Sequence, residues 1–187
     1  MASVALVATA IGLISAVSAW PGTAKQSRVR PRGVVENCAT QSGADFAGAY
    51  TSPHNLVVGP LSLVGAAGTP TFVWNSAGTE GWEKFMALVR QGHRVTVELS
   101  RTTRRGGAGL AYGPLPQGET YLRDTHRVVT FIACKSGSAS TADGRPVTFW
   151  SGGVLARTPR CVPLLVWVDK RLKPRRVVIH LGVASCG

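Results

Sequence analysis

The sequence predicts an all-β fold: a two-layer, immunoglobulin-like β-sandwich with one short helix and two disulfides, preceded by an N-terminal hydrophobic helix. Three observations predict it. They are short apolar runs bounded by turn residues, alternation of apolar and polar side chains within some of these runs, and four widely spaced cysteines. At 187 residues the chain has room for one ordinary domain with a single core.

The predicted hydrophobic helix occupies residues 1–20, in which no charged residue occurs. Its length fits either a signal peptide, cleaved after Val17-Ser18-Ala19, or a transmembrane anchor. Basic residues follow this run and none precedes it, which by the positive-inside rule leaves the next domain in the cytoplasm. The cysteines favour an extracytoplasmic location, secreted or anchored to the cytoplasmic membrane. A start codon assigned too far downstream would remove the conflict. We expect residues 21–37 to form a flexible basic linker and residues 38–187 the β-sandwich domain.

The four cysteines are even in number, far apart and all downstream of the hydrophobic run, as is typical of disulfides in an oxidising compartment. They are Cys38, Cys134, Cys161 and Cys186. Three connectivities are possible, and we favour Cys134 with Cys161 and Cys38 with Cys186. This choice depends on a chain reversal at Gly152-Gly153, because tandem glycine inside a strand pattern marks a bulge or a tight turn.

Eight apolar runs predict the strands. They cover residues 56–64, 71–74, 93–100, 109–112, 127–134, 146–156, 162–168 and 176–183. Alternation is clean in 93–100, where Val95, Val97 and Leu99 face one side. The runs 127–134 and 162–168 are apolar on both faces, which is typical of central strands.

One segment departs from the strand pattern. Trp82, Phe85, Met86 and Val89 recur at helical spacing, which predicts the single short helix over residues 80–91.

Several C-terminal motifs carry a resemblance. They are Val129-Thr130-Phe131 before Cys134, Val147-Thr148-Phe149 before Gly152-Gly153, the run 159–164, and Leu181-Gly182 before Cys186. With these motifs the chain resembles a family of uncharacterised exported or membrane-anchored proteins of high-GC bacteria. The resemblance implies a leader and a disulfide-bearing β domain, and it supplies no activity or catalytic residue to transfer.

Composition excludes two classes of protein and suggests a partner. With 44% hydrophobic and 16% charged residues, the chain is neither disordered nor a multi-span membrane protein. The formal charge of +12 favours anionic partners, although a GC-rich genome also produces arginine-rich chains.

Basic residues gather in two clusters beside predicted loops. One cluster contains Arg101, Arg104 and Arg105, and the other contains Lys170, Arg171, Lys173, Arg175 and Arg176. Clustered cations bind phosphate or carboxylate groups, so we expect anionic envelope polymers, which include teichoic-type polymers and acidic glycans, or lipid head groups as partners. Ordinary solubilising loops are the alternative. Nucleic acid is not expected, because no helix-turn-helix or aromatic RNA-binding pattern accompanies the charge.

No local motif indicates catalysis, a metal or a cofactor. The sequence lacks GxSxG, HExxH and SxxK motifs, and its cysteines have no CxxC spacing. Glu119 and Asp124, which flank Tyr121, fit ordinary surface charge. We therefore favour a non-enzymatic envelope protein. The alternative is a small extracytoplasmic hydrolase that brings His54, His93 or His126 together with a distant acid.

Overall fold

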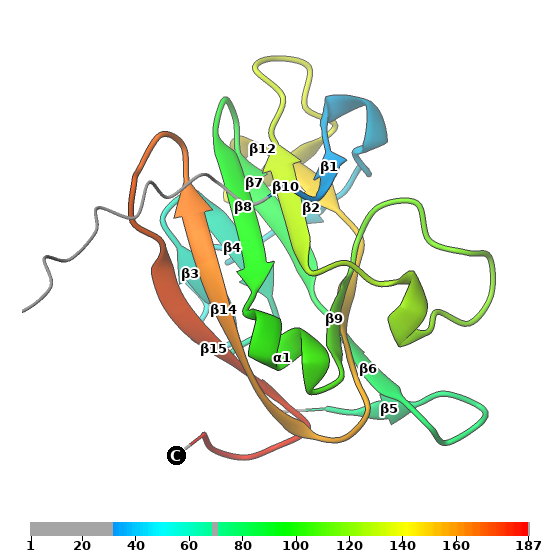
Figure 1. Ribbon diagram of the computed structural model, residues 1–187. Helices are drawn as coiled ribbons and strands as arrows, with labels where there is room; N and C mark the ends of the chain where they lie inside the picture. The colour runs from blue at the N-terminus through cyan, green and yellow to red at the C-terminus, as the bar shows by residue number, and fades with distance from the viewer. Residues whose placement is uncertain (1–31, 69–70, 187) are drawn as a thin grey trace, which may run out of the picture.

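The computed structural model describes residues 32–68 and 71–186, and strands form most of the regular structure in this part (Figure 1). It also contains one α-helix, α1 (Arg101–Arg105), and two short 3-10 turns, η1 (Cys38–Thr40) and η2 (Leu122–Asp124). The prediction of a β-rich fold is confirmed, and the fold contains one short helix, although at a different place from the one predicted.

Sheet A has five strands and supplies one layer of the fold. In spatial order they are β1 (Val34–Glu36), β10 (Val128–Ile132), β8 (Arg94–Leu99), β14 (Arg160–Val168) and β15 (Arg175–Leu181). All neighbours are antiparallel except β1, which runs parallel to β10. The two apolar runs expected in central strands form β10 and β14, which are both interior. Because β1 belongs to the sheet, the end of segment 21–37 is part of the folded structure.

Sheets B and C supply the facing layer. Sheet B contains, in order, β2 (Asp45–Phe46), β11 (Ser140–Ala142), β12 (Arg145–Trp150), β7 (Met86–Arg90), β4 (Leu61–Val64) and β3 (Leu56–Val58). Sheet C contains β5 (Val73–Trp74), β6 (Gly81–Lys84), β13 (Gly153–Ala156) and β9 (Ala108–Ala111). Figure 1 shows sheet A lying in front of β4, β7 and β12.

Sheets B and C are joined through one long pair of antiparallel segments. Residues 81–90 run opposite 147–156 in a single register, with Val147 beside Arg90, Gly153 beside Lys84 and Ala156 beside Gly81. At the break between the strands, the Phe85 N–H donates to the Gly152 carbonyl at 3.0 Å. A Cβ on Gly152 would lie 2.2 Å from the Tyr112 ring, so this close approach requires glycine. The glycine pair interrupts the strand without reversing it, and the predicted reversal is wrong.

The predicted helix over 80–91 is also wrong, because this segment forms β6 and β7. Strand β7 lies between β12 and β4 and pairs with both. Its residues Ala87, Leu88 and Val89 are fully buried, as expected for an interior strand covered on both faces. Backbone hydrogen bonds along both edges of β7 stabilise the strand. They outweigh the helical spacing of the apolar residues, because no strong helix cap accompanies that spacing. The helix lies instead at Arg101–Arg105, where the Ser100 hydroxyl accepts from the Thr103 N–H at 3.0 Å.

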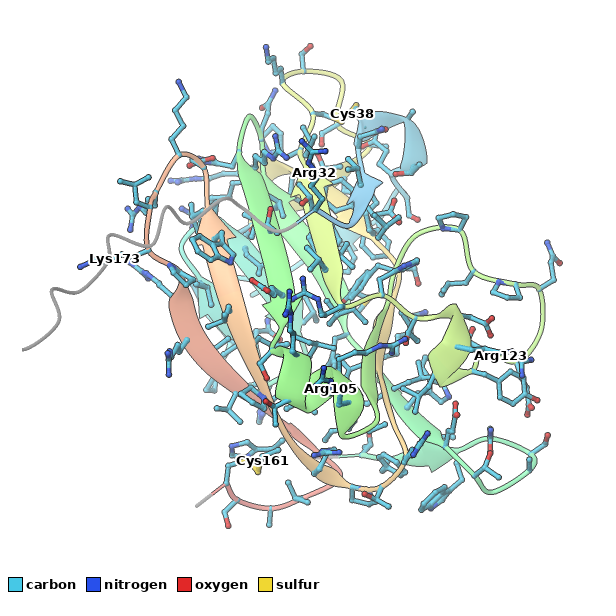
Figure 2. All side chains as sticks on the ribbon, in the orientation of Figure 1. Arg32, Cys38, Arg105, Arg123, Cys161 and Lys173 are labelled. Atoms are coloured by element: carbon cyan, nitrogen blue, oxygen red, sulfur yellow. A yellow bond between two sulfur atoms is a disulfide. The ribbon has the colours of Figure 1, made fainter. Side chains whose placement is uncertain are left out.

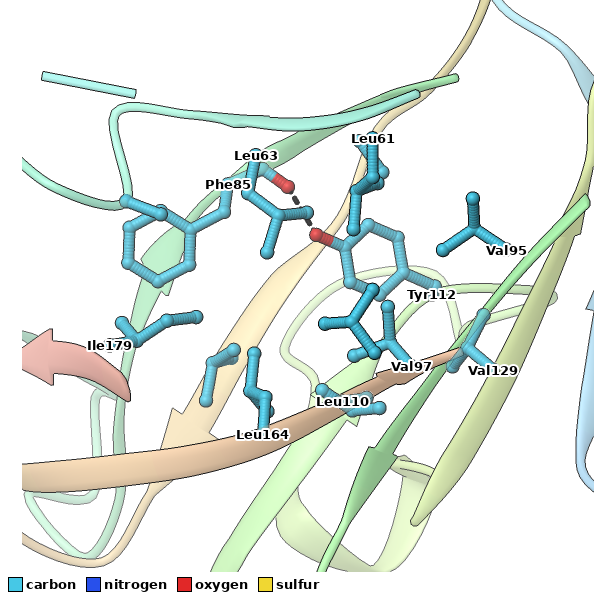
Figure 3. Close-up of a cluster of buried hydrophobic side chains, with 14 of the residues drawn as sticks. Leu61, Leu63, Phe85, Val95, Val97, Leu110, Tyr112, Val129, Leu164 and Ile179 are labelled. Atoms are coloured by element: carbon cyan, nitrogen blue, oxygen red, sulfur yellow. Dashed lines mark hydrogen bonds between the residues drawn. The ribbon is translucent and has the colours of Figure 1, made fainter. Parts of the chain in front are cut away.

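One apolar core fills the space between the two layers. In Figure 3, Val95 and Val97 of β8 and Leu164 of β14 face Leu61 and Leu63 of β4. The buried Tyr112 hydroxyl donates to the Phe85 carbonyl, so this polar atom is satisfied inside the core. Burial raises the pKa of Tyr112, and the phenol is therefore neutral.

All four cysteines are paired, as predicted, but the favoured connectivity is wrong. The disulfides join Cys38 to Cys134 and Cys161 to Cys186. Because β1 runs parallel to β10, the ends of these two strands bring Cys38 beside Cys134. Cys161 lies in the β14–β15 hairpin opposite His180, within reach of the C-terminal segment. The pairing of β1 with β10 therefore determines the first disulfide, and the β14–β15 hairpin determines the second.

The predicted leader, residues 1–20, and residues 21–31 of the predicted linker lie outside the described residues. Among the residues described, no helix is long and apolar enough to cross a membrane.

Candidate functional site

The first predicted basic cluster lies on α1, at the end of β8, and its members have different environments. Arg104 is half-buried and donates from both terminal nitrogens. Nη1 contacts Thr125 Oγ1 at 2.6 Å and the Ala108 carbonyl at 3.3 Å, while Nη2 contacts the carbonyls of Leu122 and Thr125 at 2.9 and 3.1 Å. Arg101 and Arg105 are exposed. Arg104 is thus occupied in joining α1 to the 122–125 segment, which leaves Arg105 available to a ligand.

A pocket of about 400 Å³ opens beside α1, and we call it the basic pocket. Four arginines line it together with one carboxylate and an aromatic ring: Arg104, Arg105, Arg123, Arg157, Glu80 and Tyr121. They come from α1, from η2 and its neighbours, from the residue before β6 and from the residue after β13. Arg101 is not among the lining residues.

Three of these arginines present accessible guanidinium groups. In the described part of the chain, the Arg105 and Arg157 side chains make no hydrogen bond or ion pair. Arg123 lies over the Tyr121 ring, with its guanidinium carbon 4.6 Å from the ring centre, and its Nε is 3.8 Å from Asp124. The one carboxylate, Glu80, accepts from the Leu122 N–H at 2.6 Å. Positive charge therefore exceeds negative charge, and planar guanidinium groups suit bidentate binding of phosphate or carboxylate.

The second predicted cluster lies elsewhere. Its members occupy the β14–β15 turn and the first residues of β15, at the end of sheet A away from α1: Lys170, Arg171, Lys173, Arg175 and Arg176. Figure 2 shows Lys173 far from Arg105 and Arg123. All five side chains are exposed, and none lines the basic pocket. The fold does not bring the two predicted clusters together.

A second hollow, of about 450 Å³, lies next to the basic pocket, and we call it the aromatic groove. Trp82 of β6 and Leu155 of β13 are paired neighbours on the face of sheet C that points away from the main core. Trp74, at the end of β5, and Leu115, in the connection from β9 to η2, complete the apolar lining. Lys84, Glu119, Thr120 and Ser151 add polar groups.

By hydrogen bonds, Glu119 connects two segments that line this groove. Its carboxylate accepts from the Ser76 N–H at 2.8 Å, the Ser76 hydroxyl at 2.9 Å and the Tyr121 hydroxyl at 2.9 Å. The bonds from Ser76, with that from Tyr121, hold the pKa of Glu119 below its ordinary value, and the bond to Glu119 raises the pKa of Tyr121. Asp124 accepts from the Tyr121 N–H at 3.0 Å. The two acids expected to be plain surface charge therefore order this loop.

The histidines do not converge on either hollow. His93 Nδ1 pairs with Asp169 at 2.9 Å on a partly exposed surface. Within residues 32–68 and 71–186, the buried His126 Nε2 has no hydrogen-bond partner. Gly113 lies beside both His126 and Glu36, since a Cβ on Gly113 would be 3.7 Å from His126 Nε2 and 3.4 Å from Glu36 Oε1. Neither pair lines the basic pocket or the aromatic groove. Among the described residues, no group of three or more His, Cys, Asp or Glu could hold a metal.

Sequence reasoning found Arg105 but missed the residues that complete the site. Arg123 and Arg157 are isolated in the sequence and become neighbours only through folding. The helical spacing predicts Trp82 on the apolar face of a helix, whereas Trp82 lies in β6. The sequence does contain a signal for the groove. If residues 82–84 form a strand, side chains alternate between its faces, so Trp82 and Lys84 lie on the same face.

Comparison of the chain with protein-family models, with curated proteins and with solved structures found no match. The resemblance to exported proteins of high-GC bacteria therefore stays a prediction.

Proposed function

We propose that this protein is a non-enzymatic, exported or membrane-anchored domain that binds anionic groups of the cell envelope at its basic pocket. The observation that carries the proposal is the convergence of Arg105, Arg123 and Arg157, from three separate segments, around one hollow with a single carboxylate. The ligand groups are phosphates or carboxylates, carried by an envelope polymer or by lipid head groups.

Two features support the proposed location. Paired cysteines fit an oxidising compartment, since cytosolic thiols are kept reduced. The hydrophobic run at residues 1–20 supplies a signal peptide or an anchor. We also retain the immunoglobulin-like sandwich as a proposal, which is supported by the single core shared between facing sheets.

Of the two predicted basic clusters, the proposal assigns anion binding to the one on α1. Exposed cations on a turn, such as Arg171 and Lys173, are solvated and screened by salt, so each contributes little to a specific contact. Arg105 and Arg157 instead line a common pocket with Arg123. Several guanidinium groups can therefore meet one anion there.

The test measures binding of the full chain, with both disulfides formed, to two probes: a poly(glycerol phosphate) polymer and vesicles containing phosphatidylglycerol. Arg105→Gln with Arg157→Gln should weaken binding by roughly tenfold or more, because two charge-assisted contacts are lost. Added salt should weaken it further. The probe that responds identifies the source of the anionic group.

The matched control is Arg171→Gln with Lys173→Gln, which removes the same charge from the other end of sheet A. It should change affinity by less than about twofold. Equal losses in the two double variants would show that only net charge matters, and would overturn the proposed site. Failure to bind either probe at low salt would overturn the function itself.

A further inference from the structure

The aromatic groove exposes two large indole rings on a folded surface. Trp74 is 48% exposed and Trp82 is 40% exposed. Trp74 packs edge-on against Phe72, with the ring centres 4.8 Å apart, and Phe72 in turn contacts the main core. The contact with Phe72 therefore holds the Trp74 ring in place. Large aromatic side chains that are exposed to solvent beside a pocket are typical of binding sites.

The rim of the groove is polar, and several of its groups are free to bind. In the described part of the chain, no hydrogen bond engages the side chains of Lys84, Thr120 or Ser151. Glu119 Oε1 accepts one bond and Oε2 two, so the carboxylate retains acceptor capacity. The groove thus offers an apolar floor with donors and acceptors around it.

This combination matches the two-sided chemistry of a sugar ring. A pyranose presents polarised C–H groups on one face, which suit the electron-rich face of an indole, and hydroxyl groups around its edge. An apolar peptide or an acyl chain would cover the indoles but would leave the Lys84 ammonium and the rim hydroxyls without partners. The polar rim therefore favours a glycan over a purely apolar ligand.

The groove and the basic pocket are lined by neighbouring residues of the same two segments. Glu80 lines the pocket and Trp82 lines the groove, two residues apart along the chain at β6. Glu119 and Thr120 belong to the groove, while Tyr121 belongs to the pocket and bonds to Glu119. A chain of linked sugars lying in the groove can therefore extend toward the arginines.

We propose that the aromatic groove binds the sugar rings of a glycan, and that the ligand of the two hollows together is an acidic polysaccharide. The proposal that sugar rings bind in the groove depends only on the residues of the groove. The second part rests on the proposed function of the basic pocket, which receives the phosphate or carboxylate of the glycan.

The experiment applies the full chain to a printed array of neutral and acidic bacterial oligosaccharides. Trp82→Ala should weaken binding to every retained oligosaccharide by roughly tenfold or more, because a stacked aromatic anchor is lost. Trp82→Phe keeps an aromatic face and should retain most of the binding. Leu172→Ala removes another exposed apolar side chain, 80% exposed in the β14–β15 turn, and should have no effect. Unchanged thermal unfolding verifies that each variant is folded.

The same array separates the two proposals. Arg105→Gln with Arg157→Gln should weaken only the acidic members. If Trp82→Ala weakens binding and the arginine variant does not, the glycan site stands and the proposed anion function fails. If the arginine variant alone has an effect, the anion site stands and the glycan inference is overturned. Retention of no oligosaccharide, or Trp82-dependent binding of an apolar peptide alone, also overturns it.

Discussion

Two adjacent arginines on α1 show how neighbours with the same side chain differ in role. Arg104 turns toward the interior and satisfies the carbonyls of Ala108, Leu122 and Thr125. Arg105 points outward and makes no such bond. Guanidinium groups suit both tasks, since their N–H donors can hold backbone oxygens or an anion.

We therefore expect Arg104→Met and Arg105→Met to separate stability from binding. Arg104→Met should lower the free energy of unfolding by about 2–3 kcal/mol, because the guanidinium contacts to Ala108, Leu122 and Thr125 are lost. Arg105→Met should change it by less than about 0.5 kcal/mol. Chemical denaturation of the oxidised proteins measures both. Similar values for the two variants would contradict the assigned roles.

At the scale of elements, Glu119 joins the segment between β9 and η2 to the β5–β6 hairpin. Its hydrogen bonds lower its folded-state pKa below the ordinary 4.5. A lowered folded-state pKa means that the carboxylate stabilises this contact above its unfolded-state pKa, and that the stabilisation is lost as pH falls through the folded-state value. Glu80 and Arg123 are the other charged groups around the bonded Tyr121.

Acidification should consequently release this segment. As Glu119 becomes protonated, the Ser76 amide should lose its ionised acceptor, and its NMR signal should move over the range of roughly pH 2 to 6. The midpoint should lie below 4.5. Glu119→Gln cannot titrate and should abolish this transition. A midpoint above 4.5, or an identical transition in Glu119→Gln, would show that Glu119 is not the tether.

Other elements explain what the sequence could and could not predict. The strand runs were recognisable because alternation and burial on both faces are local patterns, as in β8 and β14. Residues 80–91 carry a spacing compatible with a helix. Pairing with other strands makes them strands: β5 and β13 pair with residues 81–84, and β4 and β12 pair with residues 86–90. Likewise, the continuous strand through Gly152-Gly153 depends on the opposing segment and not on the glycines themselves.

For the whole molecule, the hardest features to predict were those that join distant parts of the chain. Even cysteine number predicted two disulfides, but their connectivity follows from the parallel pairing of β1 with β10, whose partners are 95 residues apart in sequence (Val34 beside Val129). The clustered arginines of α1 predicted an anion site from the sequence. Arg123 and Arg157 become neighbours of Arg104 and Arg105 only in three dimensions. The two predicted basic clusters, similar in composition, lie at opposite ends of sheet A.

This separation gives the most direct test of the central claim, that anions bind specifically beside α1. The full chain is titrated with inorganic phosphate at low salt while the arginine Nε–H signals are followed by NMR. The signals of Arg105, Arg123 and Arg157 should shift together and saturate with one dissociation constant, while those of Arg171, Arg175 and Arg176 should change far less. Equal shifts at both ends of sheet A, or shifts that never saturate, would contradict the claim.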